Sequence, residues 1–500
     1  MRGERLGGFI VRRGFATYLL IEIIQMTILL FCFWTRGSVS IDNVASAERF
    51  IGLWALINIV SYFIYYHRVS DEWISVANLF VVFLYLFNLG IPISRFLGWI
   101  DDSTEAFLSR RVYPMGYSLS IEFCVYCFLI ISMLQVGIMY YMNHNIKTKE
   151  ARDEYESDGE VYKYQLAVCV KIGKILMVLT AIPYIYQEYM YLKNSMIYGY
   201  QNAENTFSLA GTGIGLISGL FVVGIIMLLI GYQKRTKVFN WIFVIAFVYQ
   251  IIRMLISGDR STGMVLILVW LLIRQRYVKP ITGKHIPIYL VGIYVAMLGL
   301  KLIEMTRSIN SASASEVLTE LFQKNMLVET INEYGGNVWS GLMVFYSVPA
   351  TGGFRYGLMY LAAIVGKPLS ILGITNDVWY YADFSRFLNE SGRGALISSL
   401  TGAMGGSFTG EWWFNFGWVG IILIPFFGYF LAKFSDACEN RAYNPVLSGY
   451  LLYVATMVIW WVRQYCTSVS WNAMVYGVVV LILYQIIMAR KRGGFGIHEE

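Results

Sequence analysis

Stretches of about 20 mostly apolar residues recur along almost the whole chain, and this is the length that a helix needs to cross the hydrocarbon core of a bilayer. The loops between them hold most of the charged residues. By this criterion the chain contains about twelve candidate spans. They fall near 15–34, 50–66, 74–93, 116–141, 166–192, 209–232, 238–256, 261–277, 286–304, 412–434, 445–466 and 470–489. The pattern predicts an all-α polytopic membrane protein.

The composition supports this fold class and excludes several others. Hydrophobic residues make up 57% of the 500 residues and charged residues 14%, whereas about a quarter of an ordinary globular protein is charged. A soluble core could not bury so much apolar surface and still cover itself with polar groups. Soluble enzymes, secreted modules and nucleic-acid-binding proteins are therefore excluded, and membrane lipids are the expected surroundings.

The basic residues predict which way the spans run. If the N-terminus is cytoplasmic, the cytoplasmic loops hold clusters such as Arg12 with Arg13 and Lys234 with Arg235, whereas the short outer loops hold fewer basic residues. The bias is roughly threefold, in the direction of the positive-inside rule. We therefore expect an even number of spans, with both termini in the cytoplasm.

A long segment interrupts the series of hairpins and divides the chain into three parts. Residues 1–304 hold the first nine predicted spans, residues 305–411 form a large loop on the outer side, and residues 412–500 hold the last three spans and a cytoplasmic tail. The loop includes an amphipathic stretch at 314–334. It also includes a short apolar run at 356–366, which is too short to span and favours a re-entrant or surface-lying helix. Long loops with helices of their own are usually functional.

The positions of the histidines limit the chemistry of the outer side. The chain has four, and all of them, His67, His144, His285 and His498, fall in predicted cytoplasmic segments. The outer side therefore lacks the residue that most metal clusters and activated nucleophiles use. We expect no His–Cys metal cluster and no histidine-activated nucleophile there, and acid–base chemistry would rely on Asp, Glu, Tyr, Lys or Arg.

Arginines and carboxylates are the candidate functional groups of the outer side. Guanidinium groups bind phosphate oxygens in pairs and stay charged, so several of them in one place would suit a diphosphate. Each group also has a plain structural interpretation, such as a solvated hairpin ion pair or an arginine that reaches the lipid headgroups. The candidates are Arg253, Asp259, Arg260, Arg307, Arg355, Asp383, Arg386, Arg393, Glu411 and Arg463.

Two stretches carry a resemblance to a known family. They are GDRSTGMVLILVWLL at 258–272, which resembles an outer hairpin leading into a span, and GGSFTGEWWFNFGWVGIILIPFFGYFLAKF at 405–434, which resembles the entry to the span after a large loop. With about twelve spans and the large loop before the last three, the chain resembles the Wzy-type polymerases of O-antigen and capsule repeat units.

The resemblance implies an activity and roles for these residues. Such enzymes transfer a growing glycan from undecaprenyl diphosphate to the next lipid-linked unit on the outer face of the inner membrane, and a chain-length regulator is a possible partner. A carboxylate would be the base for the attacking hydroxyl, and arginines would stabilise the leaving diphosphate. The implied catalytic residues are Glu411, Asp383, Arg260 and Arg463, and the implied residues for diphosphate or glycan are Arg253, Asp259, Arg355, Arg386, Arg393 and Arg307.

Three other functions stay open at this point. An O-antigen ligase shares the layout but uses a histidine in the large outer loop, which this chain does not have. A glycosyltransferase that uses polyprenyl-phosphate sugars would place an acidic motif in the first outer loop, where Asp42 and Glu48 are too far apart. A flippase for lipid-linked oligosaccharides would show two related halves. A test of transfer with purified protein would separate an enzyme from a flippase.

Overall fold

We describe a computed structural model of the chain. It describes residues 4–6, 9–11, 13–40, 42–70, 72–100, 117–153, 159–198, 213–257, 260–278, 326–350, 353–366, 383–388, 405–439 and 444–495, with the single positions 292, 299 and 369. Within these ranges the chain is helical apart from an antiparallel pair of short strands, β1 (Glu4–Leu6) and β2 (Phe9–Val11). Nine of the described helical segments are long and apolar enough to cross a membrane. A polytopic membrane protein is therefore confirmed.

The predicted spans can be compared with the described helices one by one. Nine of them coincide with the nine helical segments that could cross a membrane. At two further positions the structure has α10 (Arg260–Tyr277) and α22 (Pro445–Trp461), which are helices of 18 and 17 residues. The predicted span at 286–304 lies outside the described residues.

Two compact units share the chain. Unit 1 comprises Met1–Glu150, Val328–Ser435 and Val458–Trp471, and unit 2 comprises Ala151–Leu327, Asp436–Met457 and Asn472–Glu500. The division falls inside α5 (Tyr117–Asp153), α21 (Gly420–Glu439), α22 and α23 (Cys466–Phe495). Each unit is described separately below.

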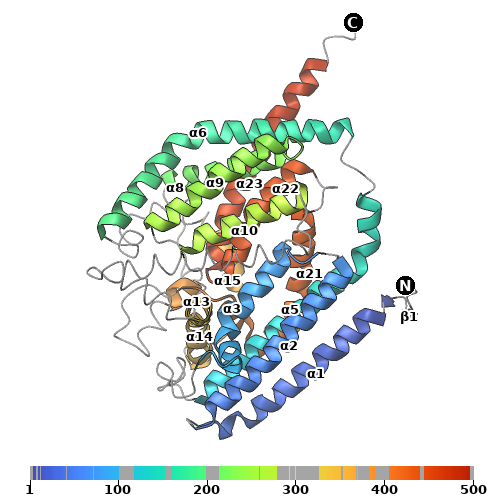
Figure 1. Ribbon diagram of the computed structural model, residues 1–500, viewed down its shortest axis with the longest axis vertical. Helices are drawn as coiled ribbons and strands as arrows, with labels where there is room; N and C mark the ends of the chain where they lie inside the picture. Colours follow the sequence, from blue (N-terminus) through green and yellow to red (C-terminus); the bar gives the residue numbers. More distant parts are fainter. Residues whose placement is uncertain are drawn as a thin grey trace. The chain divides into compact units, whose positions relative to one another are not determined.

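The first four long helices form the body of unit 1, where they lie side by side (Figure 1). They are α1 (Arg13–Thr35), α2 (Val44–Ser70), α3 (Val76–Phe96) and α5. Glycines allow close approach: Gly52 on α2 touches the carbonyl group of Pro92 on α3, and Gly137 on α5 touches that of Pro425 on α21. Small residues at helix contacts are typical of packing in membranes, where dispersion forces hold helices together.

A layer of hydrogen-bonded polar side chains crosses these four helices. Asn58 on α2 donates to Glu22 Oε2 at 2.8 Å and to Gln25 Oε1 at 2.7 Å, both on α1. Tyr85 on α3 donates to the amide oxygen of Asn58, and Gln135 on α5 donates to the Tyr85 hydroxyl at 3.1 Å. All five side chains are buried. The layer fixes the register of the helices, because a polar group in the membrane interior must find a partner.

Helix α14 (Val338–Ala350) is a part of unit 1 that the hydropathy pattern did not reveal. The sequence places these residues inside the large loop, yet Leu342, Met343 and Val344 are fully buried. The helix packs on α20 (Phe408–Phe416), and Phe345 lies against Trp413 with ring centroids 4.0 Å apart. The helix is preceded by α13 (Met326–Gly335), which covers part of the predicted amphipathic stretch.

The tenth predicted span begins earlier than expected and is broken. Its first part is α20, and a turn of 3-10 helix at Gly417–Val419 separates it from α21. Gly417 has φ +53°, a conformation that glycine adopts without strain, and the ring of Phe354 fills the space where a side chain would be. Glu411 therefore lies inside a short half-helix, three residues after its start.

Unit 2 contains α6 (Glu160–Tyr198), α8 (Gly213–Gly231), α9 (Thr236–Ser257) and α10. Gly173 on α6 and Gly224 on α8 face each other, so these two helices pack closely along their length. In Figure 1, α8, α9 and α10 run next to one another. Burial is lower here, and α6 exposes Val178 and Ile182, as expected for side chains in contact with lipid.

Candidate functional site

Glu411 is the most deeply enclosed of the predicted site residues. It lies on α20 and is 0% exposed. Its Oε2 accepts a hydrogen bond from the indole Nε1 of Trp461 at 2.6 Å, and its Oε1 accepts one from the backbone N–H of Cys466 at 2.9 Å. Trp461 is the last residue of α22, and Cys466 is the first residue of α23. One carboxylate thus joins the ends of two consecutive helices.

Arg463 lies in the turn between those two ends. The sequence had placed it within a span reaching residue 466, but α22 ends at Trp461 and the backbone N–H of Arg463 donates to Trp460. Its guanidinium carbon lies 6.0 Å from the ring centres of Phe87 and Trp460. Within the described residues no carboxylate lies within ion-pair distance of this arginine.

The segment Gly405–Ser407 supports the turn from the other side. A Cβ on Gly406 would collide with the carbonyl group of Gln464, and one on Gly405 would lie 3.8 Å from Nε of Arg463. Phe408 donates its backbone N–H to the carbonyl oxygen of Val462 at 3.2 Å. The backbone of 405–408 therefore lies against that of 462–464, and only glycine permits this contact at position 406.

Ser407 and Thr409 determine where α20 begins. The Ser407 hydroxyl accepts a hydrogen bond from the backbone N–H of Gly410, which is a typical N-cap. Thr409 donates to the amide oxygen of Asn88 on α3 at 2.7 Å, and all three side chains are buried. The start of α20 is thereby tied to the body of unit 1.

Arg355 is buried beside α20. Its backbone N–H donates to the carbonyl oxygen of Phe414 at 3.0 Å, and the next residue, Tyr356, donates to that of Asn415 at 2.7 Å. The guanidinium lies over the rings of Phe414 and Phe387, at 4.7 and 5.7 Å from their centres. The arginine is thus held by cation–π contacts and is 6% exposed.

Asp383 and Arg386 belong to one short helix, α18 (Phe384–Arg386). Asp383 is its N-cap and accepts a hydrogen bond from the backbone N–H of Arg386 at 3.2 Å. Phe384 packs against Phe414 on α20 and against Tyr465 in the Arg463 turn. Asp383 is only partly buried, whereas Glu411 is completely buried.

The structure therefore brings five of the predicted residues into unit 1. They are Arg355, Asp383, Arg386, Glu411 and Arg463. Arg253 belongs to unit 2, where it forms an ion pair with Glu188 at 2.8 Å. Arg260 is the first residue of α10, and Asp259, Arg307 and Arg393 lie outside the described residues.

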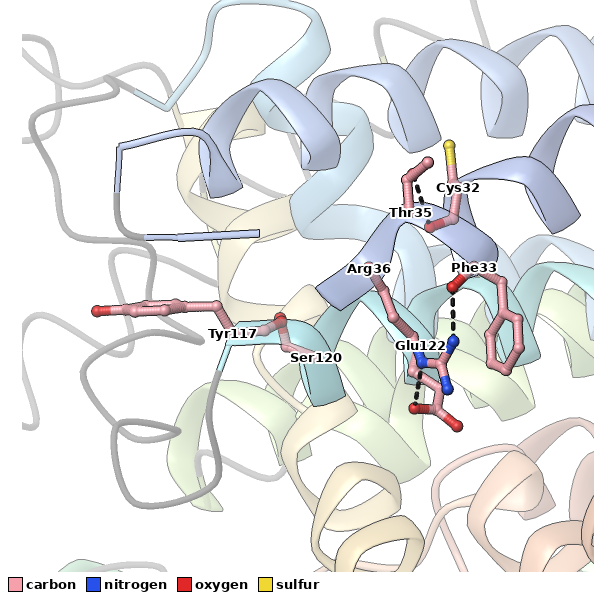
Figure 2. A network of polar contacts seen from close by, with 7 residues as sticks. All are labelled: Cys32, Phe33, Thr35, Arg36, Tyr117, Ser120 and Glu122. Atoms are coloured by element: carbon pink, nitrogen blue, oxygen red, sulfur yellow. Dashed lines mark hydrogen bonds and ion pairs between the residues drawn. The ribbon is translucent and has the colours of Figure 1, made fainter. Parts of the chain in front are cut away.

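Two ion pairs in unit 1 were missed by the sequence reasoning. Arg95 and Glu48 pair at 2.7 Å with both side chains fully buried. Arg36 pairs with Glu122 at 2.9 Å and also donates to the carbonyl oxygen of Phe33, as Figure 2 shows. Arginines at the ends of spans were the available signal, but no local pattern identifies the partner carboxylates.

Trp461 is the other residue that the sequence reasoning missed. It was read only as part of an aromatic run before Arg463, whereas its indole N–H is a donor to Glu411. Among the described residues there is no group of three or more His, Cys, Asp or Glu side chains that could hold a metal ion.

Comparison with known proteins gives one match. The family model described as "O-antigen polysaccharide polymerase Wzy" matches residues 21–492 of the chain. No curated protein and no solved structure matches it. The matched range includes every described helix that contributes to the site.

Proposed function

Because the chain belongs to the O-antigen polysaccharide polymerase Wzy family, we propose that it joins oligosaccharide repeat units carried by undecaprenyl diphosphate. The hydroxyl at the nonreducing end of the next lipid-linked unit attacks the anomeric carbon of the growing chain. A new glycosidic bond forms, the bond to the diphosphate oxygen breaks, and undecaprenyl diphosphate leaves. The proton of the hydroxyl passes to a carboxylate.

The observation that carries this proposal is the position of Arg463. Its guanidinium has no carboxylate within ion-pair distance among the described residues, and it lies in a turn fixed on both sides by α20 and its glycine entry. A fixed cation is what the developing negative charge of a diphosphate leaving group requires. Arg95 and Arg36 differ from Arg463, because each already forms an ion pair. Glu48 neutralises Arg95, and Glu122 neutralises Arg36.

We assign the base to Asp383. It is partly accessible, and its neighbour Phe384 packs on Tyr465 in the Arg463 turn. Both oxygens of Glu411, the other candidate, already accept hydrogen bonds inside the protein. Arg355 and Arg386 would bind the glycan or the diphosphate, and Arg253, Asp259, Arg260, Arg307 and Arg393 stay further candidates for the same role.

The proposed function also includes a membrane side, a cofactor requirement, a partner and a product. The site faces the outer side of the inner membrane, where lipid-linked units would arrive. The reaction needs neither a metal nor a cofactor, because cations and a base are supplied by side chains. A chain-length regulator would be a separate protein, and the product would be O-antigen or capsule.

The test compares three variants in a strain that lacks its own polymerase. Arg463→Ala should shorten the polymer to single units, with transfer about 100-fold slower or more, since loss of one preorganised donor costs this much. Arg463→Lys keeps the charge and should retain part of the activity. Arg68→Ala is the control, because Arg68 lies in the last turn of α2. Normal long chains from Arg463→Ala at a normal protein level would refute the role.

A second experiment separates a polymerase from a flippase. Purified protein in sealed proteoliposomes is supplied with a synthetic lipid-linked repeat unit in one leaflet only. Longer lipid-linked products support a polymerase, and transport without any longer product would refute it.

A further inference from the structure

The carboxylate of Glu411 holds both ends of the Arg463 turn. Its two oxygens bond to Trp461, where α22 ends, and to Cys466, where α23 begins, so four residues, Val462–Tyr465, lie between the two attachment points. The attachment to Cys466 also gives a partner to one of the backbone N–H groups that the N-terminus of a 30-residue helix leaves unpaired. Each of the two carboxyl oxygens therefore has a hydrogen-bond donor inside the protein.

These contacts are difficult to combine with proton transfer from a substrate. A general base must come within hydrogen-bond reach of the hydroxyl that it deprotonates. Glu411 is completely buried, and both of its oxygens are occupied by Trp461 and Cys466. The rings of Phe408 and Tyr360 pack on the adjacent Trp412. The contacts of Glu411 are those of a side chain that holds two parts of the protein together.

We infer that Glu411 is a positioning residue, which fixes the turn so that the Arg463 guanidinium points in one direction. Without the carboxylate, the facing ends of α22 and α23 would lose the bridge across the turn, and the four-residue turn could adopt other conformations. The effect on transfer rests on the proposed role of Arg463. The effect on the turn itself does not, and it can be measured without substrate.

The direct test is a spin label at position 463. The label is attached to an Arg463→Cys variant in which Cys32, the one cysteine that is not buried, is replaced by Ser. Electron paramagnetic resonance of the full-length protein in nanodiscs then reports the mobility of the turn. We expect an immobilised label with Glu411 present and a mobile label with Glu411→Gln or Trp461→Phe.

Trp412→Phe is the matched control. Trp412 is the next residue to Glu411 on α20, it is also buried, and its indole N–H has no hydrogen-bond partner among the described residues. This variant loses the same ring area without losing a bond to Glu411, so the label should stay immobilised. A label of equal mobility in all variants would overturn the inference. If Glu411→Gln does not fold, Trp461→Phe alone decides the question.

Activity supplies the second readout. Trp461→Phe leaves the Glu411 carboxyl group in place but removes one bond, and we expect polymer formation to fall about tenfold, as for the loss of one buried hydrogen bond. Full activity of Trp461→Phe together with none in Glu411→Gln would make Glu411 a base and overturn the inference. Failure of the proposed function would look different, because Arg463→Ala would then keep its activity while the label results stand.

Discussion

Gly406 lies directly against the carbonyl group of Gln464, and the contact leaves no room for a side chain. The two residues are 58 positions apart in the sequence, which corresponds to about 16 turns of a helix. Their contact fixes the distance between the entry of α20 and the Arg463 turn.

Gly406→Ala should impair polymer formation about tenfold, because the added methyl group pushes the two backbones apart and overpacking of this kind costs about 1–3 kcal/mol. Gly405→Ala is the control, since its Cβ would be 3.6 Å from the nearest atom and fits without movement. Chain length in the complemented strain and the thermal midpoint of the purified protein are the measurements. Equal behaviour of the two alanine variants would contradict the prediction.

Glu48→Gln should destabilise the protein strongly. It leaves the buried Arg95 charge without its carboxylate, and breaking one side of a buried ion pair costs about 3–5 kcal/mol. Glu122→Gln, which affects the partly exposed pair with Arg36, should cost less than about 1 kcal/mol. The free energy of unfolding in mixed micelles would be compared for both variants, and a similar loss in each would refute the distinction.

Asn58→Leu should lower the free energy of unfolding by about 1–3 kcal/mol, because Glu22, Gln25 and Tyr85 each lose a buried partner. Thr27→Ala on the exposed side of α1 removes a hydrogen bond within the helix and should have little effect. The same unfolding assay applies. A neutral Asn58→Leu variant would mean that the polar layer does not hold the helices together.

Gly417→Ala should destabilise the break between α20 and α21 for two reasons. A non-glycine residue at positive φ costs about 1–2 kcal/mol, and its Cβ would be only 2.5 Å from the Phe354 ring. Gly98→Ala separates the two effects, because Gly98 also has positive φ but has open space around it. The Gly417 variant should lose more stability than the Gly98 variant, and the difference measures the crowding.

The spans could be predicted from the sequence because the membrane requires a long apolar run for each, and the run is local information. The search for long apolar runs did not detect helix α14, because its 13 residues are too few to span a membrane. It is stabilised by burial against Trp413 and Phe123, which come from distant segments. The sequence of residues 338–350 alone does not indicate which residues they pack against.

The site was predictable as a set of residue types but not as an arrangement. Charge and position singled out Arg463 and Glu411, and the structure places both in unit 1. The bond that relates them runs through Trp461, 50 residues from Glu411, and depends on where α22 ends. Arg253 was also singled out by its charge and position, but in the structure it pairs with Glu188, which lies 65 positions earlier in the sequence.

The burial of α5 has a consequence for biosynthesis. Tyr126 on this helix bonds to the carbonyl oxygen of Gly417, 291 residues further along the chain, so at the usual pace of translation its partner emerges roughly 15 to 60 seconds later. During that interval α5 must sit in the bilayer, or against the insertion machinery, without α20 and α21. Truncated chains that stop before Gly417 should therefore be recognised by membrane quality control, whereas the complete chain buries α5 on release.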